Sequence, residues 1–294
     1  SDGDAVVVLK AGLELLLDHG GAVAGQLRYG LGGETTVAAR SVERLPVKFY
    51  GTWRCPYSHR VWIGLEEKHT EYQWVEIDLY RKGDAGQWRM ALEELRELYP
   101  DFVRCSQRGR LPALDNDGEH VEDSLILLEY IHEVFVGGPL LPTSPGLRAK
   151  VKLWAKHVDL EVAPHFDRLL SAHDAEARGQ ARNDLVQGLA LFEAAMAPQS
   201  EGPFFLGDDF SMADIALAPW WLRVISVLRA YRKFDPGAHP RLQVWYEAVE
   251  ARPSFQRTKV DPERLIEEFS GFADLEESAQ FRRVGGSSLA RGRR

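Results

Sequence analysis

The pattern of apolar and polar positions changes character about halfway along the chain. From residue 46 to residue 135, short apolar runs alternate with segments in which apolar residues recur every three or four positions. From residue 147 to residue 260, only the second pattern is present. Short apolar runs are typical of strands and the longer period is typical of helices. The sequence therefore predicts a mixed α/β domain followed by an all-helical domain.

The mixed part is predicted to have the order β-α-β-α-β-β-α. Its strands are expected at residues 47–50, 73–77, 113–115 and 120–122, and its helices at residues 56–68, 86–99 and 124–135. The first two strands should be parallel, because a helix connects them. The last two should form an antiparallel hairpin, because Asn116, Asp117 and Gly118 between them favour a tight turn.

Three prolines and three glycines within residues 137–146 predict a linker between the two parts. In the helical part, apolar residues have helical spacing from 147 to 162, and further helices are expected at 185–196, 211–228 and 241–250. The extension before the first domain has helical spacing at Leu9, Leu13 and Leu16. The predicted organisation is an N-terminal extension (1–45), a first domain (46–136), the linker (137–146), a helical domain (147–260) and a weakly patterned, Arg-rich C-terminal tail (261–294).

Composition and charge narrow the class of protein. The formal net charge is −8, from 36 basic and 44 acidic residues, which argues against a nucleic acid as partner. The longest apolar stretch, residues 6–17, is interrupted by Lys10 and Glu14 and is shorter than the roughly 20 residues of a membrane span. Cys55 and Cys105 are too few for a disulfide scaffold. We expect no stable membrane insertion, reduced thiols and a cytoplasmic protein, or an organellar one if a targeting segment has been removed.

Cys55 is the strongest candidate for a reactive group. It follows the first predicted strand and precedes Pro56, which opens a helix. Free N–H groups and the dipole at a helix start favour an anion, and the thiolate is the reactive form of cysteine. Ser58 stands where a dithiol oxidoreductase has its second cysteine, so an external thiol would have to resolve a mixed disulfide on Cys55. Cys105 is the alternative resolving thiol, provided that the fold brings it close.

Two further motifs flank the predicted hairpin. Pro112 cannot donate a hydrogen bond to a strand ladder, so it should lie at a strand start, after Leu111. Glu122, Asp123 and Ser124 open the next helix, where free N–H groups, a hydroxyl and a carboxylate meet. Such a group suits a ligand that carries both an ammonium and a carboxylate, such as a γ-glutamyl unit; the alternative is an ordinary helix cap.

A second cap motif opens the main helix of the helical part. Ser211 and Asp214 match a capping box, which we interpret as a folding signal. Trp220, Trp221 and Arg223 follow on the same helix. They are candidates for an acceptor pocket, with core packing as the alternative for the two tryptophans.

Together these motifs resemble the Cys-type glutathione transferases, the omega and lambda classes, over residues 46–260. The segment Cys55-Pro-Tyr-Ser-His-Arg-Val-Trp-Ile63 looks most like the lambda class. The further motifs that recur in the family's order are Leu111-Pro-Ala-Leu114, Glu122-Asp-Ser124, Pro203-Phe-Phe-Leu-Gly207 and Ser211-Met-Ala-Asp214. The resemblance implies the glutathione transferase fold, with a thioredoxin-like α/β N-terminal domain, a cis bond before Pro112 and an all-α C-terminal domain.

The resemblance also implies glutathione as co-substrate, no metal, and a mixed disulfide between glutathione and Cys55. Asp123 and Ser124 would hold the γ-glutamyl end, and Asp123 stands where the family usually has Glu. The other residues that the resemblance assigns to the glutathione site are Tyr57, Leu79, Lys82, Leu111 and Pro112, with Lys82 facing the glycyl carboxylate.

The function expected from this resemblance is thiol transfer. The predicted reactions are deglutathionylation and dehydroascorbate reduction, and the predicted partners are glutathione and glutathionylated or oxidised small molecules, with the protein a monomer or homodimer. One alternative is a non-enzymatic relative like the intracellular chloride-channel proteins, against which the Glu122-Asp-Ser124 motif argues. Another is a structural transferase-like module, which would have no need of Cys55.

Overall fold

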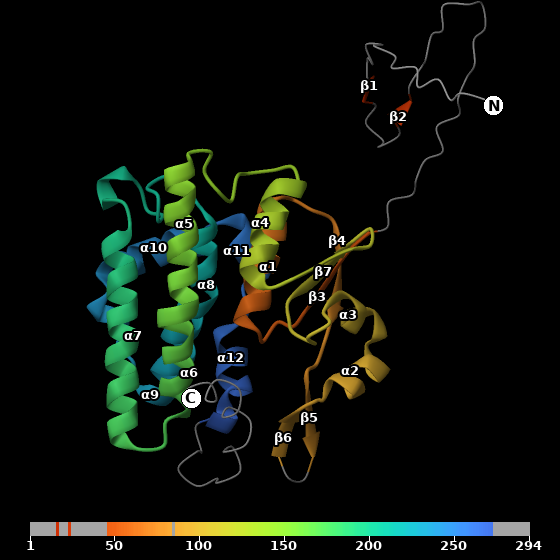
Figure 1. Ribbon diagram of the computed structural model, residues 1–294. Coiled ribbons are helices and arrows are strands. Elements are labelled where there is room, and N and C mark those ends of the chain that lie inside the picture. Colours follow the sequence, from red (N-terminus) through yellow and green to blue (C-terminus); the bar gives the residue numbers. More distant parts are fainter. Residues whose placement is uncertain (1–15, 18–22, 25–45, 84–85, 273–294) are drawn as a thin grey trace, which may run out of the picture. The chain divides into compact units, whose positions relative to one another are not determined.

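The computed structural model describes residues 16–17, 23–24, 46–83 and 86–272 (Figure 1). The chain divides into two units, Ser1–Leu45 and Pro46–Arg294. In the first unit, β1 (Leu16–Leu17) and β2 (Val23–Ala24) pair in antiparallel fashion. Leu16, one of the three leucines with helical spacing, therefore lies in a strand, and the other two leucines lie outside the described residues.

A four-stranded sheet with the order β4-β3-β7-β8 organises the N-terminal part of the second unit. Its strands are β3 (Val47–Gly51), β4 (Tyr72–Glu76), β7 (Ala113–Asn116) and β8 (Glu119–Glu122). As predicted, β3 and β4 are parallel and β7 and β8 are antiparallel. Asp117 and Gly118 turn between β7 and β8 with φ angles of 54° and 90°, the positive values that Asn-Asp-Gly predicts.

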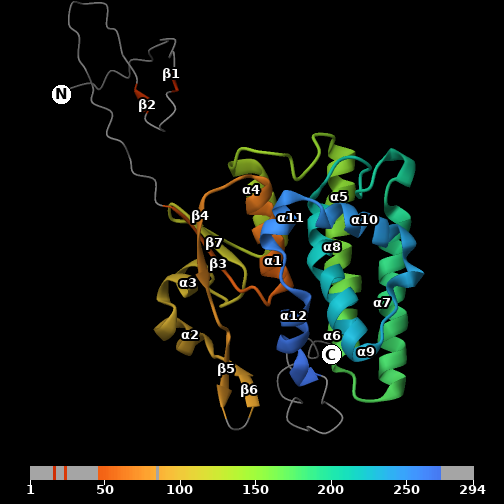
Figure 2. The ribbon, with the colours of Figure 1, turned by 180° about the vertical axis from the view of Figure 1, so that it is seen from behind.

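Helices cover both faces of this sheet (Figures 1 and 2). On one face lie α1 (Pro56–Glu67) and α4 (Ser124–Val134), and on the other α2 (Leu92–Leu98) and α3 (Pro100–Cys105). Successive strand residues point to opposite faces. Phe49 therefore packs in the large core cluster with α1 and α4, while Tyr50 packs beside Phe102 in a smaller cluster under α2 and α3.

The single helix predicted at 86–99 is wrong in its first half. β5 (Tyr80–Gly83) and β6 (Gly86–Arg89) form an antiparallel hairpin, and α2 begins only at Leu92. Pro100 has no N–H to continue α2 and instead opens α3 at its first turn. Cys105 lies between the helix predicted at 86–99 and the strand predicted at 113–115, and it is the buried last residue of α3.

The second part of the chain is helical, as predicted. Its elements are α5 (Pro145–His157), the π-helical turn η1 (Val158–Val162), α6 (Ala163–Ser171), α7 (Ala175–Ala195), α8 (Met212–Arg223), the π-helical turn η3 (Val224–Leu228), α9 (Arg229–Arg232), α10 (Pro240–Glu250), α11 (Pro253–Thr258) and α12 (Pro262–Glu268), with short 3-10 turns η2 (Gln199–Glu201), η4 (Pro236–Ala238) and η5 (Ser270–Phe272). All residues of α8 are buried. Because α8 contacts α1, α5 and α10, it is the central helix that joins the helical part to the sheet part.

The start of α12 was not predicted, since the segment from residue 261 reads as a weakly patterned tail. The side chain of Asp261 caps the helix by accepting from the N–H groups of Glu263 at 2.7 Å and Arg264 at 3.2 Å. Pro262 occupies the first turn, and Leu265 is fully buried. An N-cap residue followed by proline and an acidic residue is a helix-start signal that the sequence carries. Residues 273–294 lie outside the described part of the chain.

Candidate active site

The strand register brings the predicted site residues to one edge of the sheet. Gly51 at the end of β3 pairs with Glu76 at the end of β4. Ala113 at the start of β7 pairs with both Tyr50 and Glu122, which ends β8. The segments that hold Cys55, Leu79, Leu111-Pro112 and Asp123-Ser124 therefore all leave or enter the sheet at this edge.

Cys55 is the N-cap residue of α1. Its Sγ accepts a hydrogen bond from the backbone N–H of Ser58 at 3.5 Å, and the thiol is free and half-buried. The Oγ of Ser58 accepts from the backbone N–H of Thr52 at 3.4 Å. Cys55 thus lies between the end of β3 and the start of α1, the position that the sequence predicts.

The peptide bond between Leu111 and Pro112 is cis, as the resemblance implies. Pro112 is buried and Leu111 is half-buried, and β7 begins at the next residue. Leu79, another predicted site residue, lies half-buried between β4 and β5, where its carbonyl accepts from the N–H of Met90 at 2.9 Å. Lys82 lies in β5, and its side chain is outside the described part of the structure.

Asp123 has an uncommon backbone conformation for a residue with a side chain. Its φ is 84° and its ψ is 127°, and its Oδ1 caps α4 by accepting from the N–H groups of Leu125 at 3.0 Å and Ile126 at 3.4 Å. The carboxylate is nevertheless exposed. Positive φ at such a residue is strained, and strain of this kind concentrates at ligand sites. The carboxylate is therefore both a helix cap and available to a ligand.

Ser124 is 3% exposed, and its Oγ accepts from Nη1 of Arg60 at 3.2 Å. The same Nη1 donates to Asp159 at 2.7 Å, and Nε of Arg60 donates to the carbonyl of Ala216 at 2.9 Å. Arg60 thus fixes the start of α4 against the helical part. Sequence reasoning missed it, because a fully buried arginine cannot be told from an exposed one by its place in a helix.

Tyr57 lies on the first turn of α1 and is half-buried. Its ring packs edge-on against Trp220, with 5.3 Å between centroids, and the guanidinium of Arg60 lies 5.1 Å from its ring centroid. Burial raises the pKa of Tyr57, so it keeps its proton at neutral pH.

The candidates for an acceptor pocket, Trp220, Trp221 and Arg223, are all buried within α8. Trp220 is 2% exposed and Trp221 is 1% exposed. Trp220 also packs against Phe166, at 5.5 Å between centroids. This placement favours the core-packing alternative for the tryptophans, whereas the guanidinium of Arg223 is directed to the loop before Cys55.

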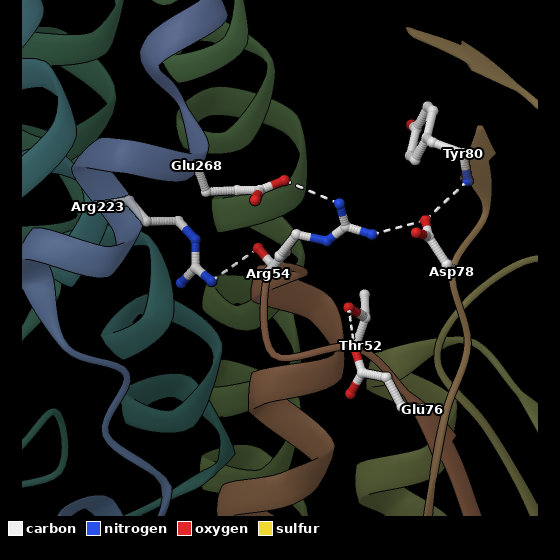
Figure 3. A network of polar contacts seen from close by, with 7 residues as sticks. All are labelled: Thr52, Arg54, Glu76, Asp78, Tyr80, Arg223 and Glu268. Atoms are coloured by element: carbon white, nitrogen blue, oxygen red, sulfur yellow. Dashed lines mark hydrogen bonds and ion pairs between the residues drawn. The ribbon is translucent and has the colours of Figure 1, made fainter. Parts of the chain in front are cut away.

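The residue before Cys55 is held from two sides (Figure 3). Nη1 of Arg54 binds Glu268 of α12 at 2.8 Å, and Nη2 binds Asp78 at 2.7 Å. Asp78 in turn accepts from the backbone N–H of Tyr80 at 3.0 Å. Next to this pair, the guanidinium of Arg264 lies 3.7 Å from the ring centroid of Trp53. α12, which the sequence analysis did not predict, is therefore part of the site.

Asp167 of α6 is an acidic group whose charge acts on Tyr57 and Tyr80. Its side chain reaches solvent, but the surrounding protein desolvates it enough to raise its pKa to about 7. Partial burial also raises the pKa of Tyr80. The positive charge of Arg89 opposes this rise, and the negative charges of Cys55 and Asp167 add to it. Asp167 is thus within electrostatic range of the thiol site, although no sequence motif marks it.

Two properties of the described residues concern metal binding and membrane insertion. Within residues 46–83 and 86–272, no group of three His, Cys, Asp or Glu side chains is arranged to hold a metal ion. No helix in the described part of the chain is both long and apolar enough to cross a membrane.

Comparisons with known proteins identify relatives of this chain. Residues 54–134 match the family model of the glutathione S-transferase N-terminal domain, and residues 163–248 match that of the C-terminal domain. A probable glutathione S-transferase of Nicotiana tabacum is 31% identical over 180 residues, which cover 60% of this chain and 72% of that protein. Glutathione S-transferase L3 of Arabidopsis thaliana is 29% identical over 76% of this chain and 86% of its own length.

Solved structures give the same result. The crystal structure of glutathione transferase Omega 3C from Trametes versicolor has a TM-score of 0.65 and 32% identity, and the match covers 78% of this chain and 90% of that one. The predicted fold, a thioredoxin-like α/β domain followed by a helical domain, is confirmed. This chain belongs to the glutathione transferase family.

Proposed function

We propose that the chain is a glutathione-dependent thiol transferase that works through a mixed disulfide between Cys55 and glutathione. The observation that carries the proposal is the position of the Cys55 Sγ as the cap of α1, with Ser58 in place of a second cysteine. Family membership supports glutathione as the thiol. A relative from rice has been solved in complex with glutathione, and its fold matches this chain with a TM-score of 0.63.

The proposed reaction has two displacement steps. The Cys55 thiolate attacks the glutathione sulfur of a substrate disulfide, a new S–S bond forms, and the substrate thiolate leaves and takes a proton from water. A free glutathione thiolate then attacks the glutathione sulfur on Cys55, which releases glutathione disulfide and the Cys55 thiolate. With dehydroascorbate, two electrons and two protons pass to the substrate while two glutathione molecules become one disulfide.

Glutathione itself is proposed to lie along the sheet edge. The exposed carboxylate of Asp123 would pair with its ammonium group, and the start of α4 at Ser124 would face its γ-glutamyl carboxylate. The backbone of Leu111, held by the cis bond to Pro112, would face the cysteinyl unit. The remaining proposed contacts are Tyr57, Leu79 and Lys82.

Cys105 supports the monothiol form of the mechanism. It lies in the cluster under α2 and α3, and its Sγ donates to the carbonyl of Leu114 at 3.1 Å. Burial raises the pKa of the Cys105 thiol to about 12, so it holds its proton at neutral pH. It is therefore poorly suited to resolve a disulfide on Cys55.

Intact mass after treatment with oxidised glutathione tests the proposal. We expect one glutathione adduct on the wild-type protein, none on Cys55→Ser and one on Cys105→Ser, with thioltransferase activity following the same order. Cys105→Ser is the matched control, because serine retains a donor for the carbonyl of Leu114. A Cys55–Cys105 disulfide as the main product, or full activity in Cys55→Ser, would contradict the mechanism.

A further inference from the structure

Arg223 reaches from the central helix of the helical part to the loop that carries Cys55. Its side chain is 0% exposed. Nη2 donates to the carbonyl oxygens of Arg54 at 2.9 Å and Trp53 at 3.5 Å, and Nη1 donates to the carbonyl of Pro219 at 2.8 Å. Figure 3 shows the guanidinium directed at the backbone of Arg54, one residue before the thiol.

The charge of Arg223 has no carboxylate partner among the residues that the structure describes. Two neighbouring arginines do have such partners, Arg54 with Asp78 and Glu268 and Arg60 with Asp159. Nε of Arg223 also has no hydrogen-bond partner within the described part of the chain. A buried cation without an anion is costly, so such a group persists where another anion offsets its charge.

The thiolate of Cys55 can supply that anion. Carbonyl groups of the loop orient the guanidinium, and the next residue along the loop is the cysteine. Burial lowers the pKa of Arg223, and the negative charge of Cys55 is the main effect that raises it again.

We propose that Arg223 is a positioning residue that holds the Cys55 loop by its carbonyl groups and provides the buried counter-charge of the Cys55 thiolate. This role replaces the one in an acceptor pocket that the sequence suggests for Arg223. The role of Arg223 rests on the proposed function, in which the Cys55 thiolate is the attacking group.

Of the described titratable groups near this pair, His59, Tyr246 and Arg54 keep one charge state near neutral pH, whereas Asp167 does not. His59 of α1 is fully buried, and burial holds its pKa well below the usual range, so it is neutral. Burial raises the pKa of Tyr246 of α10, so it is also neutral. Arg54 is charged but paired with its two carboxylates. The exception is Asp167 of α6, with a pKa of about 7, and its effect cancels when variants that share it are compared.

The rate of alkylation of Cys55 by iodoacetamide against pH tests this role, with the site identified by peptide mass. Arg223→Gln removes the charge but retains a donor, and we expect the midpoint of its pH profile to rise by about one unit. Below the midpoint, this corresponds to roughly tenfold slower alkylation. Arg223→Lys retains the charge and should keep a midpoint close to that of the wild-type protein.

Arg241→Gln is the matched control. Arg241 also binds backbone carbonyls, those of Pro203 at 2.8 Å and Gly202 at 2.9 Å, in the helical part of the chain. We expect it to leave the alkylation profile unchanged even where it lowers stability. Alkylation needs no glutathione, so this readout is separate from the adduct test of the proposed function. Equal profiles for the wild-type protein and Arg223→Gln, or an equal shift in the Gln and Lys variants, would overturn the role of Arg223.

A second measurement leaves Arg223 intact, so it can be made even if Arg223→Gln does not fold. The thiolate should pair with Arg223 only in the folded chain, so its contribution to stability is present at high pH and lost as the pH falls. The difference in melting temperature between the wild-type protein and Cys55→Ser should therefore increase from about pH 6 to about pH 9. A difference that stays constant over this range would overturn the proposal.

Discussion

The starts of α4 and α8 use the same kinds of residue in opposite ways. At α4, Asp123 is exposed, has a φ of 84° and uses its Oδ1 for two backbone N–H groups. At α8, Asp214 is fully buried and accepts four hydrogen bonds, each at 2.8 Å. The four donors are the N–H groups of Phe205 and Ser211, the Ser211 hydroxyl and the Trp245 indole.

A carboxylate has about four acceptor positions. Asp214 uses all of them inside the protein, so its charge is satisfied without a ligand and the cap contributes only to the fold. Asp123 leaves part of its capacity open and is held in a strained conformation. The degree to which a cap is saturated, rather than its sequence, therefore distinguishes a folding signal from a candidate binding site.

The largest expected effect is that of Asp214→Ala. Removal of the carboxylate leaves four buried donors without an acceptor, and we expect a loss of about 3–5 kcal/mol in the free energy of unfolding. Urea denaturation measures it, with Asp209→Ala, an exposed neighbour, as the control. A loss comparable to that of the control would show that saturation does not matter for stability.

The second prediction concerns the open cap. Asp123→Ala should weaken glutathione binding roughly 10- to 100-fold, because a charged partner of the ammonium is lost, worth about 1.5–3 kcal/mol. Asp123→Asn keeps the cap and tolerates positive φ but removes the charge, so it should weaken binding to a similar extent with little change in stability. Calorimetric titration with glutathione measures both variants. Unchanged affinity in the two would mean that Asp123 is only a helix cap.

The neighbouring serines offer a smaller, paired test. Ser211→Ala should reduce the free energy of unfolding by about 1 kcal/mol, the usual loss for an N-cap, with the affinity for glutathione unchanged. Ser124→Ala should lower that affinity, because Ser124 lies at the proposed γ-glutamyl site. If both variants lower the free energy of unfolding and neither changes the affinity for glutathione, the contrast between the two helix starts is limited to the aspartates.

The smallest effect is expected at Asp167, a carboxylate that caps no helix. Its pKa is raised from 3.8 to about 7 in the folded chain, so the folded state binds more protons than the unfolded state between these values. Stability from this group therefore falls as the pH rises through that window. Asp167→Asn should raise the melting temperature relative to the wild-type protein more at about pH 8 than at about pH 4. Solvent reduces this effect because the side chain of Asp167 is exposed. Asp209→Asn is the control, and we expect no gain in its melting temperature.

Features set by short segments of the chain could be predicted from the sequence. The turn at Asp117 and Gly118 and the capping box at Ser211 and Asp214 depend on residues within a few positions of one another. The position of Cys55 at the start of α1 follows from a strand and a proline on either side of it. These elements form as predicted because their hydrogen bonds are local.

Features set by contacts between distant segments could not be predicted. Arg223 and the loop at Trp53 are 170 residues apart, and no periodicity connects them. Arg60 is similar, since its partner Asp159 is 99 residues away. The error at 86–99 has another origin, because apolar spacing in a short segment fits both a hairpin followed by a helix and one long helix.

The ion pair between Arg54 and Glu268 has a consequence for the order in which the protein is made. The two residues are 214 positions apart, so the loop before the cysteine leaves the ribosome long before α12 exists. At ~5–20 residues per second, this interval lasts roughly 10–40 s. A nascent chain can complete its sheet and α1 in that time, but the final arrangement of Trp53 and Arg54 must wait for the last described α-helix. The reactive thiol is thus translated early and brought into its working environment late.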